Sequence, residues 1–162
     1  TTEQYIKPSL PFLNLPLAYY GFYLAKKAGF QNFLLNKHHL PEQVEQLAES
    51  LREYTQSVET VDETAKLLGS GGALWNARKV LQRNEHFLVA NGDEVLFPQD
   101  DKIIKDLVES HKKSGALCTL LTCDHPELLK SLKPVWINGQ NEVQGFGMEP
   151  INSQSKPVPC GQ

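Results

Sequence analysis

The stretch FLVANGDEV, residues 87–95, decides the fold class of this 162-residue chain. It holds the apolar run Phe87–Ala90 and changes abruptly to Gly92 and Asp93, which predicts a buried β-strand over residues 86–91. Asp93 therefore follows the carboxyl end of a strand. In open α/β sheets, ligands bind outside the carboxyl ends of the strands, so Asp93 stands where a binding site is expected.

Further strands and helices alternate along the chain. Helices are expected over residues 14–29, from Pro41 onward, and over 73–82, 102–113 and 126–132; strands are expected over 30–36, 57–62, 116–122, 135–137 and 143–146. This alternation predicts an α/β fold with a mainly parallel, mixed sheet flanked by helices on both faces. The length predicts one domain over residues 1–162.

The composition excludes several classes of protein. The formal net charge is −3 and the 16 basic residues are scattered, which argues against a nucleic-acid partner because such binding needs clustered Lys and Arg. The three cysteines show no CxxC spacing, which favours a reducing, cytoplasmic setting over a disulfide framework. No apolar stretch approaches the ~20 residues that span a bilayer, so no membrane partner is expected.

Asp93, Lys7 and the glycines at 69–72 are the candidates for chemistry. A strand-end carboxylate next to glycine can hold Mg²⁺ through oxygen, although an isolated Asp in this position is more often a turn or capping residue. The Gly69–Gly72 segment is expected as a loop before a helix, where its backbone can approach a base or a phosphate. A flexible turn is the simpler interpretation of that loop. Lys7 taken alone is a surface lysine.

Other polar and aromatic residues favour structural roles. His38 and His39 are adjacent and project to opposite sides of an extended chain, so joint coordination of one metal is not expected. Cys118 and Cys123 lie on or near an apolar segment and are expected to be small buried thiols. Trp75 is expected in the core, with stacking on a base as the alternative.

Four segments, in this order, resemble the sugar-1-phosphate nucleotidyltransferases, a family of the NTP-transferase superfamily. They are KPSLPFLNLPLAYYGFYLAKKAGF (7–30), ETAKLLGSGGALWNARKVL (63–81), FLVANGDEV (87–95) and GFGMEP (145–150). Each motif is modest, but their order and spacing make the match specific. The resemblance implies a Rossmann-like nucleotidyltransferase fold.

The resemblance also implies a reaction and a set of site residues. An oxygen of a sugar-1-phosphate would attack the α-phosphorus of a nucleoside triphosphate and release pyrophosphate. Asp93 would bind Mg²⁺ and act with Lys7, which would contact phosphate, as the catalytic pair. Gly71 and Gly72 would contact the nucleotide base, and Glu149 would bind sugar hydroxyls.

Two parts of the family pattern are absent from the sequence. The first strand and its GxGTRxxPLT phosphate loop would precede residue 1, and a second metal-binding Asp would follow residue 162. We therefore expect this to be a partial domain from a longer catalytic chain. The family's EKP is here Met148-Glu149-Pro150, which puts the sugar assignment of Glu149 in question.

The base, the sugar and the assembly stay open. The glycine segment is compatible with pyrimidine or guanine, and a mannose-1-phosphate guanylyltransferase-like enzyme, or one for a related cell-envelope sugar, is expected. The alternative is a non-catalytic homologue that binds sugar nucleotides as a regulatory subunit; a generic nucleotide-binding α/β protein is a weaker alternative. Homologous enzymes range from monomers to larger assemblies, so a homo-oligomer is left open.

Overall fold

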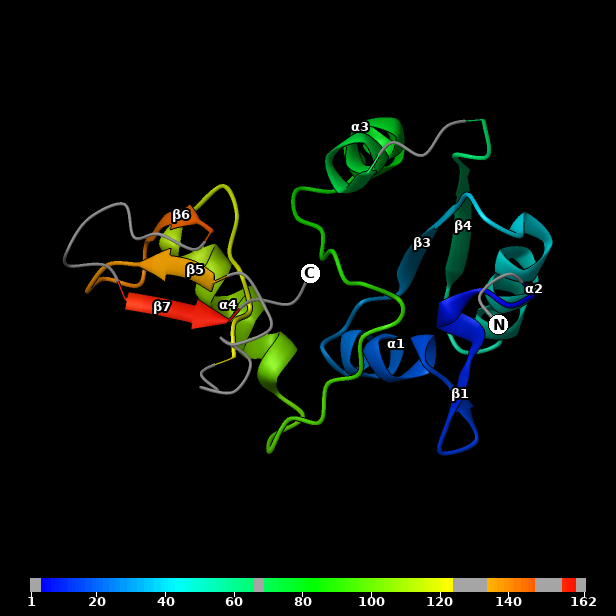
Figure 1. The fold of residues 1–162 in the computed structure, drawn as a ribbon, viewed down its shortest axis with the longest axis horizontal. Helices are drawn as coiled ribbons and strands as arrows, with labels where there is room; N and C mark the ends of the chain where they lie inside the picture. Colours follow the sequence, from blue (N-terminus) through cyan, green and yellow to red (C-terminus); the bar gives the residue numbers. More distant parts are fainter. Residues whose placement is uncertain (1–3, 66–68, 124–133, 148–155, 160–162) are drawn as a thin grey trace. The chain divides into compact units, whose positions relative to one another are not determined.

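The structure, a computed structural model, describes residues 4–65, 69–123, 134–147 and 156–159. The chain forms two compact units, residues 1–105 and 106–162, whose elements are labelled in Figure 1. Each unit is described by itself. The helix expected over residues 126–132 and the candidate residue Glu149 lie outside the described residues.

The sheet of the first unit is a parallel pair. Strand β3 (Asn32–Lys37) pairs with β4 (Ser57–Asp62) in a register that joins residues 32–37 to residues 57–62 one by one. Parallel neighbours need a crossover connection, and helix α2 (Pro41–Arg52) supplies it. Both strands and the helix were predicted from the sequence close to these bounds.

Helix α2 covers one face of this pair and builds the core (Figure 1). Its apolar stripe is buried as its spacing predicts: Ala48 is fully buried and Leu51 is 2% exposed. Aromatic residues of α1 (Ala18–Lys27), including Phe22, pack against the same cluster. The buried members of the cluster are Ile6, Val44, Leu47, Ala48, Leu51 and Val58.

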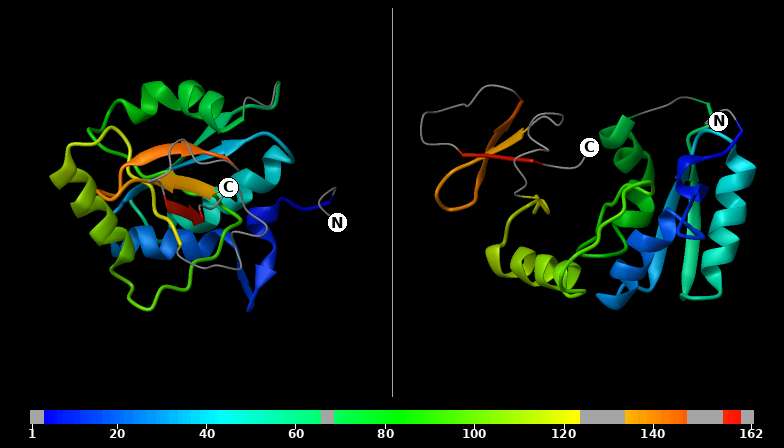
Figure 2. Two further views of the ribbon diagram at one scale, coloured as in Figure 1. Left: turned by 60° about the vertical axis from the view of Figure 1, so that its left-hand side comes forward. Right: turned by 60° about the horizontal axis from the view of Figure 1, so that its bottom comes forward.

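A short helix and a hairpin precede α1. The 3₁₀ helix η1 (Lys7–Ser9) leads into β1 (Pro11–Phe12) and β2 (Leu15–Pro16), which pair antiparallel next to α1 (Figure 2). The two turn residues between these strands have φ angles of 48° and 66°, as in tight hairpin turns. The hairpin takes up residues 11–16, so the helix expected from residue 14 begins only at Ala18.

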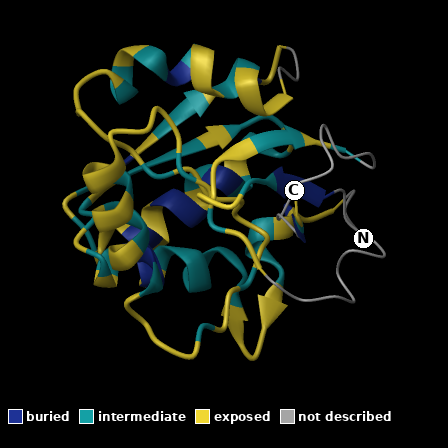
Figure 3. Cartoon of the chain, turned by 90° about the vertical axis from the view of Figure 1, so that its left-hand side faces the viewer, coloured by how far each residue is buried: buried dark blue, intermediate teal, exposed yellow. Residues whose placement is uncertain are grey.

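Helix α3 (Gly69–Leu81) begins earlier than its sequence pattern predicts. The expected glycine loop is instead the first turn of the helix, with Gly71 and Gly72 inside it. Glycine disfavours helix by only about 1 kcal/mol per residue, which packing of the later turns can offset. Ala77 is the residue of α3 that is buried, and the helix otherwise shows half-buried and exposed positions (Figure 3, top).

Residues 86–91 and 116–122 are not strands, so these two expectations are wrong. Both segments lie outside every strand pairing of the described residues. Most of their large apolar side chains are exposed, with Val89 59% exposed and Leu117 fully exposed. An apolar run becomes a strand only where a neighbouring strand accepts its backbone hydrogen bonds, and in the described part of the first unit β3 and β4 form a sheet of two.

The second unit contains a three-stranded antiparallel sheet. Helix α4 (Ile103–Ser114) contains the boundary between the two units. Along the chain it is followed by β5 (Pro134–Ile137), β6 (Val143–Phe146) and β7 (Lys156–Pro159). Within the sheet, β5 lies between β6 and β7. Strand β7 was not among the strands expected from the sequence. The buried residues among the described side chains of this sheet are Pro134, Val135, Trp136 and Val158.

Strands β5 and β6 lie close to the bounds expected for them and form an antiparallel hairpin. The Asn138 side-chain oxygen accepts hydrogen bonds from the backbone N–H groups of Gln140 and Glu142, at 3.0 and 2.9 Å, and this closes the turn. Within the described residues, no helix combines the length and the apolar character needed to cross a membrane.

Candidate functional site

The structure brings Lys7 and Asp93 together from segments 86 residues apart in sequence. Lys7 Nζ lies 3.7 Å from Asp93 Oδ2, and the two side chains are 63% and 37% exposed. An exposed ion pair of this kind contributes only about 0–1 kcal/mol to stability. Both groups therefore stay available to a ligand that offers them better partners, such as a phosphate for the lysine and a cation for the carboxylate.

Close backbone packing fixes the turn that carries Asp93. A Cβ atom at Gly92 would lie 3.1 Å from Pro8 Cγ and 3.3 Å from Pro8 Cβ, so only glycine fits there without a shift. The Asn91 side-chain amide donates to Glu94 Oε1 at 2.7 Å across the same turn. The residues after 91 are thereby held against the residues that follow Lys7.

The residues present fit a divalent cation that is shared with a phosphorylated ligand. Among the described residues, no three His, Cys, Asp or Glu side chains gather as a metal site. Mg²⁺ in phosphoryl-transfer proteins is commonly held by one or two carboxylates together with substrate phosphates and water. Asp93 can supply the carboxylate, and Lys7 beside it can supply a point charge to a phosphate.

Gly71 and Gly72 lie on a different element, the first turn of α3. Among the described residues, and apart from the adjacent residues and the helix's own backbone, no atom lies within 4 Å of a Cβ built at Gly71. The space over this turn is therefore open to a ligand as far as the described residues show. The backbone N–H groups of a helix's first turn lack partners inside the helix and carry positive potential. The helix is tied to β4 by a 3.0 Å hydrogen bond from Asn76 Nδ2 to the Asp62 carbonyl oxygen.

Two expectations about buried side chains are wrong. Trp75 is 70% exposed, and its ring lies against the Arg78 guanidinium, 4.4 Å from ring centroid to Cζ. Cys118 and Cys123 are exposed free thiols. Each was expected in the core because it belongs to an apolar pattern. The segment that carries the cysteines, however, has no strand pairing within the described residues. The Trp75 position lies on the exposed side of α3.

A polar network at the carboxyl ends of β3 and β4 was not found from the sequence. Lys37 Nζ donates to Glu45 Oε1 at 2.6 Å, and Thr60 Oγ1 donates to the same oxygen at 2.8 Å. The hydrogen bond with Glu45 raises the pKa of Lys37, while the bonds from Lys37 and Thr60 lower the pKa of Glu45. The network depends on the parallel pairing of β3 with β4, in which Lys37 lies opposite Asp62. The sequence alone does not reveal this pairing.

Glu63 follows β4 and is the buried charged residue of this region. It is 4% exposed, and its Oε1 atom has no hydrogen-bond partner among the described residues. Its backbone is held on both sides: its N–H donates to the Lys37 carbonyl oxygen at 2.8 Å, and its own carbonyl oxygen lies 2.6 Å from His38 Nδ1. His38 thus has a structural role, as expected for a polar residue at a strand end.

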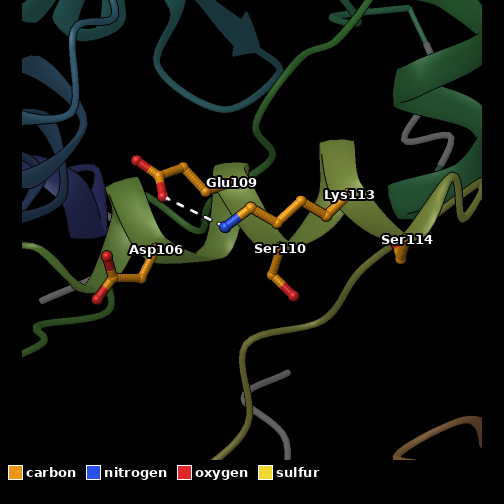
Figure 4. Close-up of a pocket in the computed structure, with 5 residues that line it drawn as sticks. All are labelled: Asp106, Glu109, Ser110, Lys113 and Ser114. Atoms are coloured by element: carbon orange, nitrogen blue, oxygen red, sulfur yellow. Dashed lines mark ion pairs between the residues drawn. The ribbon is translucent and has the colours of Figure 1, made fainter.

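Figure 4 shows an open hollow on α4. It is lined by Asp106, Glu109, Ser110, Lys113 and Ser114, all from one helix. Glu109 and Lys113 form an ion pair of 3.9 Å across one helical turn. This is the pattern of a solvated helix face, and the hollow contains no residue that the sequence singled out.

Comparison with known proteins supports the sequence resemblance. Residues 1–129 match the family model described as nucleotidyl transferase. A UTP–glucose-1-phosphate uridylyltransferase of Synechocystis sp. is 27% identical over 150 residues, which cover 83% of this chain and 36% of that relative's length. The chain therefore spans little more than a third of the length of this curated relative.

A solved structure shows the same fold. The UDP-glucose pyrophosphorylase of Acinetobacter baumanii matches with a TM-score of 0.69 at 17% sequence identity, over 95% of this chain and 66% of that one. The α/β nucleotidyltransferase fold predicted from the sequence is confirmed. Lys7, Gly71, Gly72 and Asp93 all lie within residues 1–129, which the family model matches. Because that match covers most of the chain, the protein belongs to the nucleotidyl transferase family.

Proposed function

We propose that the natural protein transfers a nucleoside monophosphate from a nucleoside triphosphate to a sugar-1-phosphate, giving an NDP-sugar and pyrophosphate. The observation that carries the proposal is the 3.7 Å approach of Lys7 Nζ to Asp93 Oδ2. This approach places a lysine, which can bind phosphate, beside a carboxylate, which can bind a metal ion. Membership of the nucleotidyl transferase family supports the same reaction.

The reaction needs charge neutralisation and alignment more than a strong base. An oxygen of the sugar-1-phosphate forms a bond to the α-phosphorus, and the bond from that phosphorus to pyrophosphate breaks with its electron pair. Lys7 would bind phosphate oxygens, and Asp93 would hold Mg²⁺, which when bound neutralises charge on the triphosphate. In-line placement of the two substrates supplies much of the rate enhancement.

The open first turn of α3 suits the nucleotide base. Backbone at Gly71 and Gly72 can approach a planar ring closely because glycine has no Cβ, and the N–H groups of a first helical turn can donate to its oxygens. Glu149 as the ligand of the sugar hydroxyls stays a prediction, since it lies outside the described residues.

Within this reaction class we propose UTP and glucose-1-phosphate as the substrates. Both relatives carry uridine and glucose in their names, one as a uridylyltransferase and one as a UDP-glucose pyrophosphorylase. They favour this pair over the mannose-1-phosphate and guanine nucleotide expected in the sequence analysis. A cytoplasmic location and a homo-oligomeric assembly stay predictions.

The test is release of pyrophosphate by the complete natural protein with Mg²⁺. A panel of UTP, GTP, CTP and dTTP is combined with glucose-, mannose- and amino-sugar-1-phosphates. Asp93→Asn and Lys7→Met should lose most of the activity, whereas the matched surface changes Asp106→Asn and Lys113→Met should keep it. Full activity of Asp93→Asn contradicts the proposed site.

The second candidate is a non-catalytic subunit that binds sugar nucleotides. The candidate site offers the Asp93 carboxylate beside Lys7, and the described residues contain no group of three His, Cys, Asp or Glu that could hold a metal ion. This arrangement also suits binding without turnover. Nucleotide-dependent stabilisation in a thermal unfolding assay, without pyrophosphate release under any combination of the panel, would favour this candidate.

A further inference from the structure

The segment that carries Asp93 is attached to the N-terminal part of the first unit at three places. The first is the contact of Gly92 with Pro8, and the last is an ion pair of 2.7 Å between Asp101 and Lys27 at the end of α1. Between them lies Phe97. Residues 92–101 thus run along the region from η1 to the end of α1, as Figure 1 shows for the segment that passes α1.

Phe97 forms an aromatic cluster with Phe12 of β1 and Tyr20 of α1. The ring centroids of Phe97 lie 6.0 Å from Phe12 and 5.7 Å from Tyr20, and Phe12 lies 5.8 Å from Tyr20. The interplanar angles of 51° to 71° give tilted and edge-to-face contacts, the arrangements that aromatic rings prefer. Tyr20 also donates its hydroxyl hydrogen to the Phe12 carbonyl oxygen at 2.7 Å, so the hairpin and α1 form one platform.

The exposure of this cluster separates its role from that of the core. Phe97 is 67% exposed and Phe12 is 41% exposed, and neither belongs to the buried cluster around α2. Exposed side chains contribute little to global stability when they are truncated. The Phe97 ring can instead restrict the conformation of a loop. Gly92 is held at Pro8 and Phe97 is held at the aromatic cluster, so residues 93–96 between them have few accessible conformations.

We propose that Phe97 is a positioning residue, which through its contacts with Phe12 and Tyr20 keeps Asp93 beside Lys7 for a divalent cation and a triphosphate. This rests on the proposed function. Phe97 touches neither substrate nor metal in this role. Its effect reaches Asp93, four residues earlier, through the anchored loop. Groups that hydrogen-bond directly to a metal ligand typically change metal affinity about 10- to 100-fold when removed, and we expect the lower end of this range for Phe97 because it acts through the loop.

The test measures metal binding directly in the complete natural protein. Mn²⁺ replaces Mg²⁺, UTP is present without a sugar-1-phosphate, and water proton relaxation reports protein-bound Mn²⁺–UTP. Phe97→Ala should weaken this binding roughly 10-fold or more while the unfolding midpoint changes by about 2 °C or less. Phe97→Leu, which keeps an apolar side chain, should recover most of the affinity.

Tyr54→Ala is the matched control. Tyr54 is 50% exposed and also makes an edge-to-face contact with α1, 6.5 Å from Tyr19, but it is not part of the segment that carries Asp93. Its truncation should leave Mn²⁺–UTP binding unchanged. If Phe97→Ala lowers the unfolding midpoint further than expected, binding is measured well below the midpoints of both variants, and a loss of affinity in Phe97→Ala that exceeds the loss in Tyr54→Ala still supports the positioning role.

The outcomes separate this inference from the proposed function. Wild-type affinity in Phe97→Ala, together with loss of binding in Asp93→Asn, overturns the positioning role and leaves the proposed function standing. Equal losses in Phe97→Ala and Tyr54→Ala also overturn it, because they show a general structural effect. Wild-type binding in Asp93→Asn overturns the metal-binding role of Asp93, and the inference falls with it.

Discussion

A Cβ atom at Gly92 would lie 3.1 Å from Pro8 Cγ, so the turn that carries Asp93 packs tightly on the residue after Lys7, and a side chain at this position would require a shift. This contact joins two motifs that the sequence separates by more than 80 residues. It makes the spacing of Lys7 and Asp93 depend on backbone packing as well as on their 3.7 Å ion pair.

Gly92→Ala is expected to impair catalysis more than stability. The added methyl group must move the turn or the Pro8 ring by a few tenths of an ångström. Since a displacement of about 1 Å at a reacting group can reduce the rate about 100-fold, this smaller displacement should reduce it by up to about 10-fold. The cost in stability should be roughly 1 kcal/mol, since the site lies at the surface. Pyrophosphate release and thermal unfolding measure the two effects. Gly139→Ala, at a glycine with nothing within 4 Å of its Cβ position, is the control and should change neither.

Gly71→Ala should move stability and activity in opposite directions. Gly71 lies within α3, and a Cβ there meets no atom within 4 Å, so alanine should stabilise the helix by about 0.5–1 kcal/mol. The same methyl group would occupy the space proposed for the base and should raise KM for the nucleotide. Thermal unfolding and steady-state kinetics check the two signs. A raised unfolding midpoint with an unchanged KM would place the base elsewhere.

Glu45→Gln should destabilise the protein at neutral pH and make no difference in acid. The hydrogen bonds from Lys37 and Thr60 lower the pKa of Glu45 below its ordinary 4.5. The stabilisation is therefore fully present above pH 4.5 and is lost as the pH falls through the lowered pKa of the folded state. Unfolding midpoints of wild type and variant should converge on acidification. Glu53→Gln, at the exposed C-terminal end of α2, is the control.

Glu63→Met is expected to stabilise the protein by about 1–2 kcal/mol. A buried carboxylate oxygen without a partner among the described residues carries a desolvation cost, and replacing a buried ionic group by an apolar one of similar size is often neutral or stabilising. Chemical denaturation measures the change. Glu59→Met removes the exposed 2.9 Å pair with Arg83 and should stay within about 0.5 kcal/mol. A large loss in Glu63→Met would show that the carboxylate has a partner beyond the described residues.

Local patterns predicted the elements that depend on short-range periodicity. The stripe of α2 repeats every three to four residues over Val44, Leu47 and Leu51, and a helix presents such residues on one face wherever it lies. The strands β3 and β4 were predicted from similar short-range signals. A short apolar run bounded by polar residues predicted β3, and a weak alternation of apolar and polar residues predicted β4.

Predictions failed where a distant partner decides the outcome. Residues 86–91 have the composition of a strand, but a strand forms only through pairing, and no pairing of this segment occurs among the described residues. Trp75 belongs to an apolar helical pattern yet is 70% exposed. Hydrophobic periodicity states which side chains share a face and not whether another element covers that face.

The sequence by itself determined the α/β class, the family and the identities of the candidate residues Lys7, Gly71, Gly72 and Asp93. These follow from residue order and local spacing. Only the tertiary structure decided that Lys7 and Asp93 lie 3.7 Å apart, that Gly92 packs on Pro8, and that Phe97 joins an aromatic cluster with Phe12 and Tyr20. Such contacts join residues far apart along the chain, and their distances depend on how the connecting elements pack, which no local pattern encodes.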